Sequence, residues 1–302
     1  MQKKDRQHTV PKVYLKNFAT VEKKREFYLY MYDKSTGKAI YTNGGNVAVE
    51  RDFYTLDGAT DQMVWEDFYS KQIEPMQSKT GSKVIWTAQS CMTRDRTAVL
   101  APYKAPLAVL MIYQMYRGRT ARKYIDKLSE RIIPKTLAEA QQLFGNTGNP
   151  ERDKFVKEFY PPPEMRKSIY ANVMTNPERL KSIAHYIEAS HIWMLFRIIG
   201  ENEFITSDNP VMLLNGKTGD PMPYHNGLAN PSTIVYYPLA PKVMIATFSS
   251  AYVDFKHLNN QIVFLDTEKN DSFVNMVNRC QFQQCDRQVF AASEKVLLSA
   301  CE

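Results

Sequence analysis

The stretch Phe204-Ile205-Thr206-Ser207-Asp208-Asn209-Pro210 places four short polar side chains between an apolar run and a proline. This pattern is typical of a strand that leaves its sheet through a tight turn. Pro210 disfavours the α region for Asn209, and Ser, Asp and Asn bond readily to nearby backbone, so the turn should be stiff. A stiff turn can aim the Ser207 hydroxyl and the Asp208 carboxylate at one point, as catalysis or tight binding requires. Alternatively, these side chains only build the turn.

Composition indicates a globular protein with a mild positive charge. The chain has 302 residues, 44% hydrophobic and 12% aromatic, and no long Gly/Ser-rich or charged linker divides it. This content is ample for a buried core and argues against disorder. The formal charge of +7 and the pI near 9.0 favour nucleic acid as a partner first and a membrane surface second. A soluble surface with a weak positive field fits these values equally well.

The cysteines and the N-terminus favour a cytoplasmic protein. Residues 1–7 are polar and do not resemble a signal peptide, so Cys91, Cys280, Cys285 and Cys301 should be reduced thiols. Cys280 and Cys285 have no second pair of ligands nearby, which argues against a zinc site. No apolar run approaches the length of about 18 residues that a membrane-spanning helix needs, so no membrane association is expected.

Helical patterns fill the middle of the chain, and strand patterns stand before and after them. Residues 26–42 carry a β-hairpin signature, and strand-like runs recur between 204 and 292. Apolar residues at helical spacing predict a buried helix within 94–124 and another over 180–199. We expect one α+β domain, residues 1–302. A central helical bundle should pack against a mostly antiparallel sheet built from the N-terminal hairpin and the C-terminal strands.

The segment 136–163 is the best candidate for a protruding, mobile insertion, and it could bind a protein partner. Its pattern is polar and helical, with interruptions at 145–150 and at Pro161-Pro162-Pro163. Basic side chains cluster before it, with the acids Asp126 and Glu130 among them. The basic residues are Arg117, Arg119, Arg122, Lys123, Lys127, Arg131 and Lys135.

His8 lies just before a short amphipathic helix predicted over 10–18, with Pro11 at a helix-opening position. Free N–H groups and the helix dipole favour anions at that end. His8 is therefore a candidate acid, base or phosphate ligand. A histidine with an unperturbed pKa can equally be a surface residue of no consequence.

Two pairs of polar residues lie on helices of the middle region. Glu66 and Glu74, eight residues apart, project toward similar sides of a helix and could hold a metal, exchange protons or simply be solvated. Gln114 and Arg117 share a face of the buried helix. A buried arginine is costly unless paired, so we expect an anionic substrate or an ion pair with Glu66 or Glu74.

Five motifs follow one another between about residues 7 and 292: His8-x-Val10-Pro11-x-x-Tyr14-Leu15-x-x-Phe18, the helix with Glu66 and Glu74, Gln114-x-x-Arg117, Thr206-Ser207-Asp208-Asn209-Pro210 and Tyr237-Pro238-Leu239. In this order they resemble the bacterial family catalogued as domain of unknown function 4238. The resemblance supplies no reaction. It implies that these separated polar residues recur as one set, which favours a single convergent pocket.

The first hypothesis is an enzyme that acts on a phosphodiester, a nuclease of bacterial or phage origin. Arg117 and Gln114 would clamp the scissile phosphate, and His8 would transfer a proton. Bound Mg²⁺ or Mn²⁺ would use Asp208 with Glu66 or Glu74. The candidate catalytic residues are His8, Glu66, Gln114, Arg117, Ser207, Asp208 and Asn209, and the candidate metal ligands are Glu66, Glu74 and Asp208.

Two alternatives stay open. The protein could be a non-catalytic module in conflict between bacteria and phages, which senses a small anionic ligand in the pocket and binds a protein partner through 136–163. It could also be a hydrolase of another substrate, with Ser207 as nucleophile and His8 as base. The sequence has no glycine-rich phosphate loop, G-x-S-x-G elbow or H-E-x-x-H motif, so the mechanisms tied to those motifs have no support.

Overall fold

The structure, a computed structural model, describes residues 6–24, 26–56, 60–91, 99–145, 147–221 and 227–301. The strands are β1 (Arg6–His8), β2 (Val21–Lys23), β3 (Glu26–Asp33), β4 (Lys38–Asn43), β5 (Val49–Arg51), β6 (His191–Ile199), β7 (Thr206–Ser207), β8 (Met212–Asn215), β9 (Thr233–Ala240), β10 (Val243–Ser249), β11 (Gln261–Asp266) and β12 (Gln288–Ala291). The α-helices are α1 (Lys12–Leu15), α2 (Val64–Phe68), α3 (Glu74–Ser90), α4 (Lys104–Arg117), α5 (Arg119–Phe144), α6 (Pro150–Glu158), α7 (Pro163–Thr175), α8 (Pro177–Ser190), α9 (Thr267–Gln284) and α10 (Glu294–Cys301).

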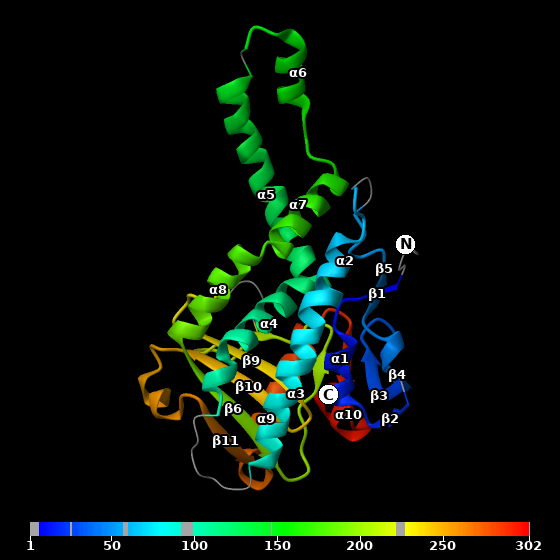
Figure 1. The fold of residues 1–302 in the computed structure, drawn as a ribbon, viewed down its shortest axis with the longest axis vertical. Coiled ribbons are helices and arrows are strands. Elements are labelled where there is room, and N and C mark those ends of the chain that lie inside the picture. The colour runs from blue at the N-terminus through cyan, green and yellow to red at the C-terminus, as the bar shows by residue number, and fades with distance from the viewer. Residues whose placement is uncertain are drawn as a thin grey trace.

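A five-stranded sheet with the order β11-β6-β10-β9-β8 forms the larger half of the body. Its strands pair antiparallel, except that β11 and β6 are parallel. Trp193 and Leu195 on β6 belong to a hydrophobic cluster that also contains residues of α3, α4 and α8. Met194 and Phe196 point to the other face, where they share a cluster with Val274 of α9. Helices therefore cover both faces of this sheet (Figure 1).

The helix predicted over 180–199 is correct only as far as Ser190, because β6 begins at His191. A strand buried on both faces is apolar throughout and lacks the alternation that marks a half-exposed strand. The buried helix predicted within 94–124 corresponds to α4 and the start of α5, and residues 94–98 lie outside the described residues.

A second sheet, with the order β2-β3-β12-β7 and β4 paired to β3, contains the predicted N-terminal hairpin. Along β3, Phe27, Leu29 and Met31 are buried while the alternating tyrosines are partly exposed. The α+β fold class is confirmed, but the prediction of one sheet is wrong, because the C-terminal strands divide between two sheets. The stretch 204–210 crosses between them: it follows β6 of the large sheet and pairs, as β7, with β12 of the small one.

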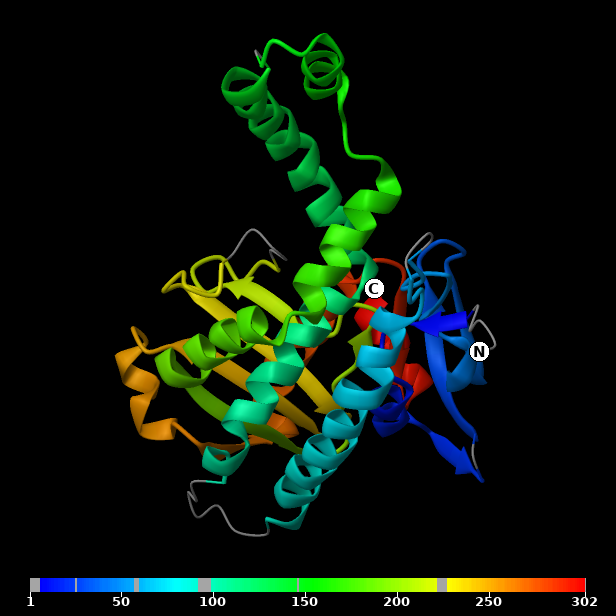
Figure 2. The same cartoon turned by 45° about the horizontal axis from the view of Figure 1, so that its top comes forward.

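Helices α5, α6 and α7 project from the body and form what we call the arm, residues 119–175 (Figures 1 and 2). The arm includes the predicted insertion 136–163 but begins and ends well outside it. The side chain of Gln141 on α5 donates hydrogen bonds to the carbonyls of Val156 and Lys157, which holds α6 against α5. Mobility of the arm stays a prediction. No helix in the described ranges, α5 included, is long and apolar enough to cross a membrane.

Candidate functional site

Arg117, the last residue of α4, lies at the centre of a buried polar cluster. Its side chain is 2% exposed. Nε and Nη2 donate hydrogen bonds of 3.1 and 2.9 Å to the carbonyl of His8 on β1. Nη2 also donates to Glu74 Oε1 at 2.8 Å, and Nε donates to the Tyr54 hydroxyl at 3.1 Å. The predicted pairing of Arg117 with a glutamate is therefore present, and Glu74 is the partner.

An irregular helical turn brings the Tyr69 ring and the Glu74 carboxylate to the Arg117 guanidinium. Residues Tyr69–Ile73 form a π-helical turn between α2 and α3, and Glu74 follows it directly. The Arg117 guanidinium carbon lies 4.5 Å from the centre of the Tyr69 ring. π-turns inside helices are often found at functional sites, because they change the direction of side chains that a regular helix would space evenly. The eight-residue spacing of Glu66 and Glu74 predicts similar sides only for a regular helix, and this turn interrupts the helix between them.

Two nitrogen atoms of the cluster lack a hydrogen-bond partner among the described residues. They are Nη1 of Arg117 and Nδ1 of His8, and both are buried. A buried polar atom without a partner is costly, so its presence in a folded protein calls for an explanation such as a bound ion, a water or a ligand. An unpaired guanidinium nitrogen can only donate, and the group that suits it best is an anion.

Burial and neighbouring groups shift the pKa values of His8 and Arg117. It lowers the pKa of His8 to about 3, with Lys12 and Arg117 acting in the same direction, so His8 is neutral at neutral pH. Burial alone would lower the pKa of Arg117, but Tyr54 and Glu74 outweigh it and the net shift is upward. The cluster thus combines a permanent cation with a neutral imidazole whose Nδ1 lacks a hydrogen-bond partner among the described residues.

Gln114 and Glu66 are two further predicted site residues that lie in the cluster around Arg117. Gln114 is 5% exposed, and its amide lies 3.5 Å from the carbonyl of Thr9, the residue after His8. Glu66 is 8% exposed and near enough to Tyr54 for its charge to raise the pKa of that tyrosine. The structure therefore brings five residues of the predicted set into one cluster: His8, Glu66, Glu74, Gln114 and Arg117.

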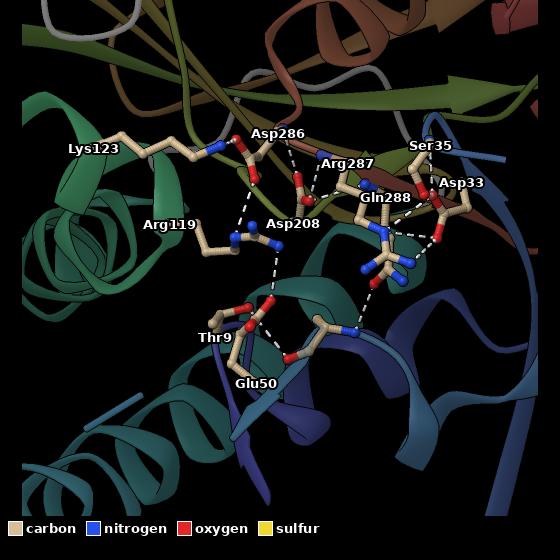
Figure 3. Close-up of polar contacts among 11 residues, drawn as sticks. Thr9, Asp33, Ser35, Glu50, Arg119, Lys123, Asp208, Asp286, Arg287 and Gln288 are labelled. Atoms are coloured by element: carbon tan, nitrogen blue, oxygen red, sulfur yellow. Dashed lines mark hydrogen bonds and ion pairs between the residues drawn. The ribbon is translucent and has the colours of Figure 1, made fainter. Parts of the chain in front are cut away.

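Asp208 lies on a different network, where it binds backbone (Figure 3). Its two carboxylate oxygens accept hydrogen bonds of 2.7 to 2.9 Å from the N–H groups of Asp286, Arg287 and Gln288. Burial raises the pKa of Asp208 to about 6, although these three N–H groups act against the shift. The carboxylate thereby fixes the connection between α9 and β12.

Ser207 and Asn209 also make structural contacts. The Ser207 hydroxyl accepts hydrogen bonds from the Gln281 amide and the Asn209 N–H. The Asn209 carbonyl accepts from the side chains of Gln281 and Gln284 on α9. His8 is not among the hydrogen-bond partners of Ser207 in the described contacts, so the hypothesis of a Ser207 nucleophile with a His8 base lacks geometric support.

A set of ion pairs next to Asp208 was not expected from the sequence (Figure 3). Arg119, the first residue of α5, binds Glu50 at 2.9 Å and Asp286 at 3.2 Å, and Lys123 also pairs with Asp286. A cavity of about 20 Å³, the size of one water molecule, lies beside Arg119, Glu50, Asp208 and neighbouring residues. The partners come from distant parts of the chain, and no local pattern could reveal them.

The predicted metal ligands do not fit a metal site in this arrangement. The Asp208 oxygens are bound to three N–H groups, and Glu74 is paired with Arg117. Within the described parts of the chain, no three His, Cys, Asp or Glu side chains are grouped so that they could hold a metal ion. We therefore derive no step through Mg²⁺ or Mn²⁺.

Fold and site together define an α+β protein with a buried arginine site at the base of a helical arm. The chain belongs to the family described as "Protein of unknown function (DUF4238)", whose model matches residues 6–295. No curated protein and no solved structure shows a significant match to this chain.

Proposed function

We propose that the protein binds a phosphodiester of nucleic acid at Arg117 and hydrolyses it. The observation that carries the proposal is the buried Nη1 of Arg117, which has no hydrogen-bond partner among the described residues. A phosphate oxygen would accept from this nitrogen in a charge-assisted hydrogen bond, which is stronger than one between neutral groups. The positive charge of the chain favours such a substrate.

His8 is the proposed general base. Its imidazole is neutral at neutral pH, and Nδ1 lacks a hydrogen-bond partner in the described structure. Nδ1 would take a proton from the attacking water as the new oxygen–phosphorus bond forms. The ester oxygen would leave as the old bond breaks and take a proton from solvent.

The remaining residues of the cluster position the guanidinium. Tyr54, Glu74 and the His8 carbonyl fix Nε and Nη2, so that Nη1 keeps one direction. A donor held in place before the reaction stabilises the negative charge of the transition state without reorganising, which is the largest single contribution in many enzymes.

The test is cleavage of single- and double-stranded DNA, RNA and tRNA by the purified protein, with Mg²⁺, with Mn²⁺ and with a chelator. Arg117→Lys keeps the charge but loses the fork geometry, and kcat/KM should fall about 100-fold or more. His8→Asn should lower it by about the same factor. Matched controls are Arg279→Lys on the exposed side of α9 and His185→Asn, whose ring is 79% exposed.

The proposal fails if the parent protein cleaves none of these substrates under any of the three conditions. It also fails if Arg117→Lys, shown by its melting temperature to be folded, cleaves as fast as the parent. Unchanged activity in both controls is required before a loss in the site variants counts as support.

One observation favours ligand sensing as a second candidate. Arg117 is separated from Arg119 only by Gly118, and Arg119 fastens the start of the arm to Glu50 and Asp286. A Cβ atom at Gly118 would lie 3.4 Å from the Asp208 carbonyl, so this connection lies against the turn that carries Asp208. A ligand at Arg117 would thus act next to the base of the arm. A melting temperature raised by a nucleotide that is recovered unchanged would support sensing over hydrolysis.

A further inference from the structure

The arm carries more than half of the excess positive charge of the chain. Residues 119–175 contain eleven Lys or Arg and seven Asp or Glu, an excess of four out of the formal +7. These residues are less than a fifth of the chain, so the positive field is concentrated on the arm. A concentrated positive field attracts polyanions and speeds their association.

Five cations of α5 recur at every fourth position: Arg119, Lys123, Lys127, Arg131 and Lys135. A helix rises about 6 Å over four residues, and residues four apart are neighbours on its surface, so these side chains form a slowly turning row. Asp126 and Glu130 belong to the adjacent row with Arg122 and lie three residues after Lys123 and Lys127. We call these five residues the cationic row.

The cationic row begins beside the buried site and leads away from it. Arg119 and Lys123 are paired with Glu50 and Asp286 at the surface of the body. Lys127, Arg131 and Lys135 are exposed, and they form no ion pair with any residue that the structure describes. The outer half of the row is therefore available to an external polyanion, and its inner end lies next to Arg117.

The outer part of the arm also carries aromatic side chains. Phe155 on α6 is 62% exposed, and its ring centre lies 5.2 Å from that of Phe159. Gln141 binds the carbonyls of Val156 and Lys157, so Phe155 is held near the end of α5. Basic surfaces that follow the backbone, combined with aromatic rings on which bases stack, are how proteins bind single-stranded nucleic acid without sequence preference.

We propose that the arm binds one extended strand of nucleic acid, with its phosphates along the cationic row, a base on Phe155 and the strand directed toward Arg117. This proposal rests on the proposed function and names its substrate class, a single strand. The row spans about 24 Å from Arg119 to Lys135, which is long enough for several nucleotides.

The experiment measures fluorescence polarisation of a labelled oligothymidylate of about 20 nucleotides, its RNA counterpart and a duplex of the same length. The triple variant Lys127→Gln/Arg131→Gln/Lys135→Gln should bind either single strand at least 10-fold more weakly than the parent. Its plot of log affinity against log salt should be shallower by about 2, since each lost phosphate contact on a single strand removes about 0.7 from the slope. Phe155→Ala should weaken binding several-fold and leave the salt slope unchanged.

The matched control is Lys38→Gln/Lys79→Gln/Lys83→Gln, which removes three exposed cations of the body and should bind like the parent. Equal binding by the arm variant and the control would overturn the arm proposal even if the parent cleaves nucleic acid. Tighter binding of the duplex than of either single strand would overturn it too. Binding that depends on the arm without any cleavage would support the arm proposal and contradict the hydrolase.

Discussion

Arg117 and Arg131 lie fourteen residues apart and have opposite surroundings. Arg117 is 2% exposed and is fixed by a carboxylate, a phenol and a backbone carbonyl. Arg131 is exposed on the arm. A buried charge requires several partners from distant segments, whereas a solvated one requires none. The body should therefore depend strongly on single polar side chains, and the arm should not.

The largest effect on stability should come from Arg117 itself. Arg117→Met keeps much of the side-chain volume but removes the guanidinium that donates to Glu74, the His8 carbonyl and the Tyr54 hydroxyl. We expect the free energy of unfolding to fall by about 3 kcal/mol, the lower end of the range for breaking a buried pair, because Glu74 is 26% exposed. Urea denaturation measures this. Arg131→Met is the control, and equal losses in the two variants would remove the contrast between body and arm.

A smaller loss is expected at Asp208. Asp208→Ala leaves the N–H groups of Asp286, Arg287 and Gln288 without an acceptor, which should cost about 2 kcal/mol. Asp208→Asn should cost less, because one oxygen can still accept. Asp254→Ala, at an exposed position, is the control for urea denaturation. A stable Asp208→Ala variant that has lost all cleavage would show that the carboxylate acts in catalysis, not as a structural anchor.

His8 should make the stability of the body depend on pH. Its pKa in the folded protein is about 3, below its ordinary value of 6.5, so the unfolded chain binds the extra proton first. Stability is unaffected by this group above pH 6.5 and falls as the pH drops from 6.5 toward 3; the free energy of unfolding is lower by about 2 kcal/mol at pH 5.

Asp208 changes the stability in the opposite direction. Its pKa is raised from 3.8 to about 6 in the folded protein, so the free energy of unfolding increases as the pH falls from 6 to 3.8. The comparison must therefore be between the parent and His8→Asn, each unfolded in urea at pH 7.5 and pH 5. The parent should lose about 2 kcal/mol more than His8→Asn between these two values. Equal losses would mean that His8 is already solvated and protonated in the folded state. His185→Asn, which changes an exposed histidine, should behave like the parent.

The smallest effect on the body should follow removal of the outer arm. Replacing residues 131–159 with a short Gly/Ser linker removes side chains that are largely exposed, Leu143 and Phe155 among them. The free energy of unfolding should change by less than about 1 kcal/mol, because little apolar surface is lost from the core. Loss of a single cooperative transition in urea would show that the arm is part of the folded core.

Much of the buried cluster was predictable from local spacing. Gln114 and Arg117 share one face of an apolar helix, and that face must enter the core, so a partner for the arginine had to exist. The pairing with Glu74 in place of Glu66 was not predictable, because it depends on the π-turn at Tyr69–Ile73. Such a turn is stabilised by the packing around it and has no reliable local signal.

The polar turn 204–210 was recognised as a strand exit, but its contacts could not be inferred. Asp208 binds backbone groups 78 to 80 residues further along the chain, and the ion pairs of Arg119 connect segments separated by up to 167 positions. Single-sequence patterns report interactions within a few residues, and only folding brings these groups together.

The sequence by itself determined the α+β class, the hairpin and the buried helix with Arg117, because hydrophobic periodicity decides which faces are buried. The tertiary structure alone decided that residues 191–199 form a strand, that the C-terminal strands divide between two sheets and that Asp208 anchors a distant connection. An apolar run that is buried on both faces has no period that would distinguish a strand from a helix. A buried carboxylate binds the N–H groups that folding brings near it, and these can come from any part of the chain.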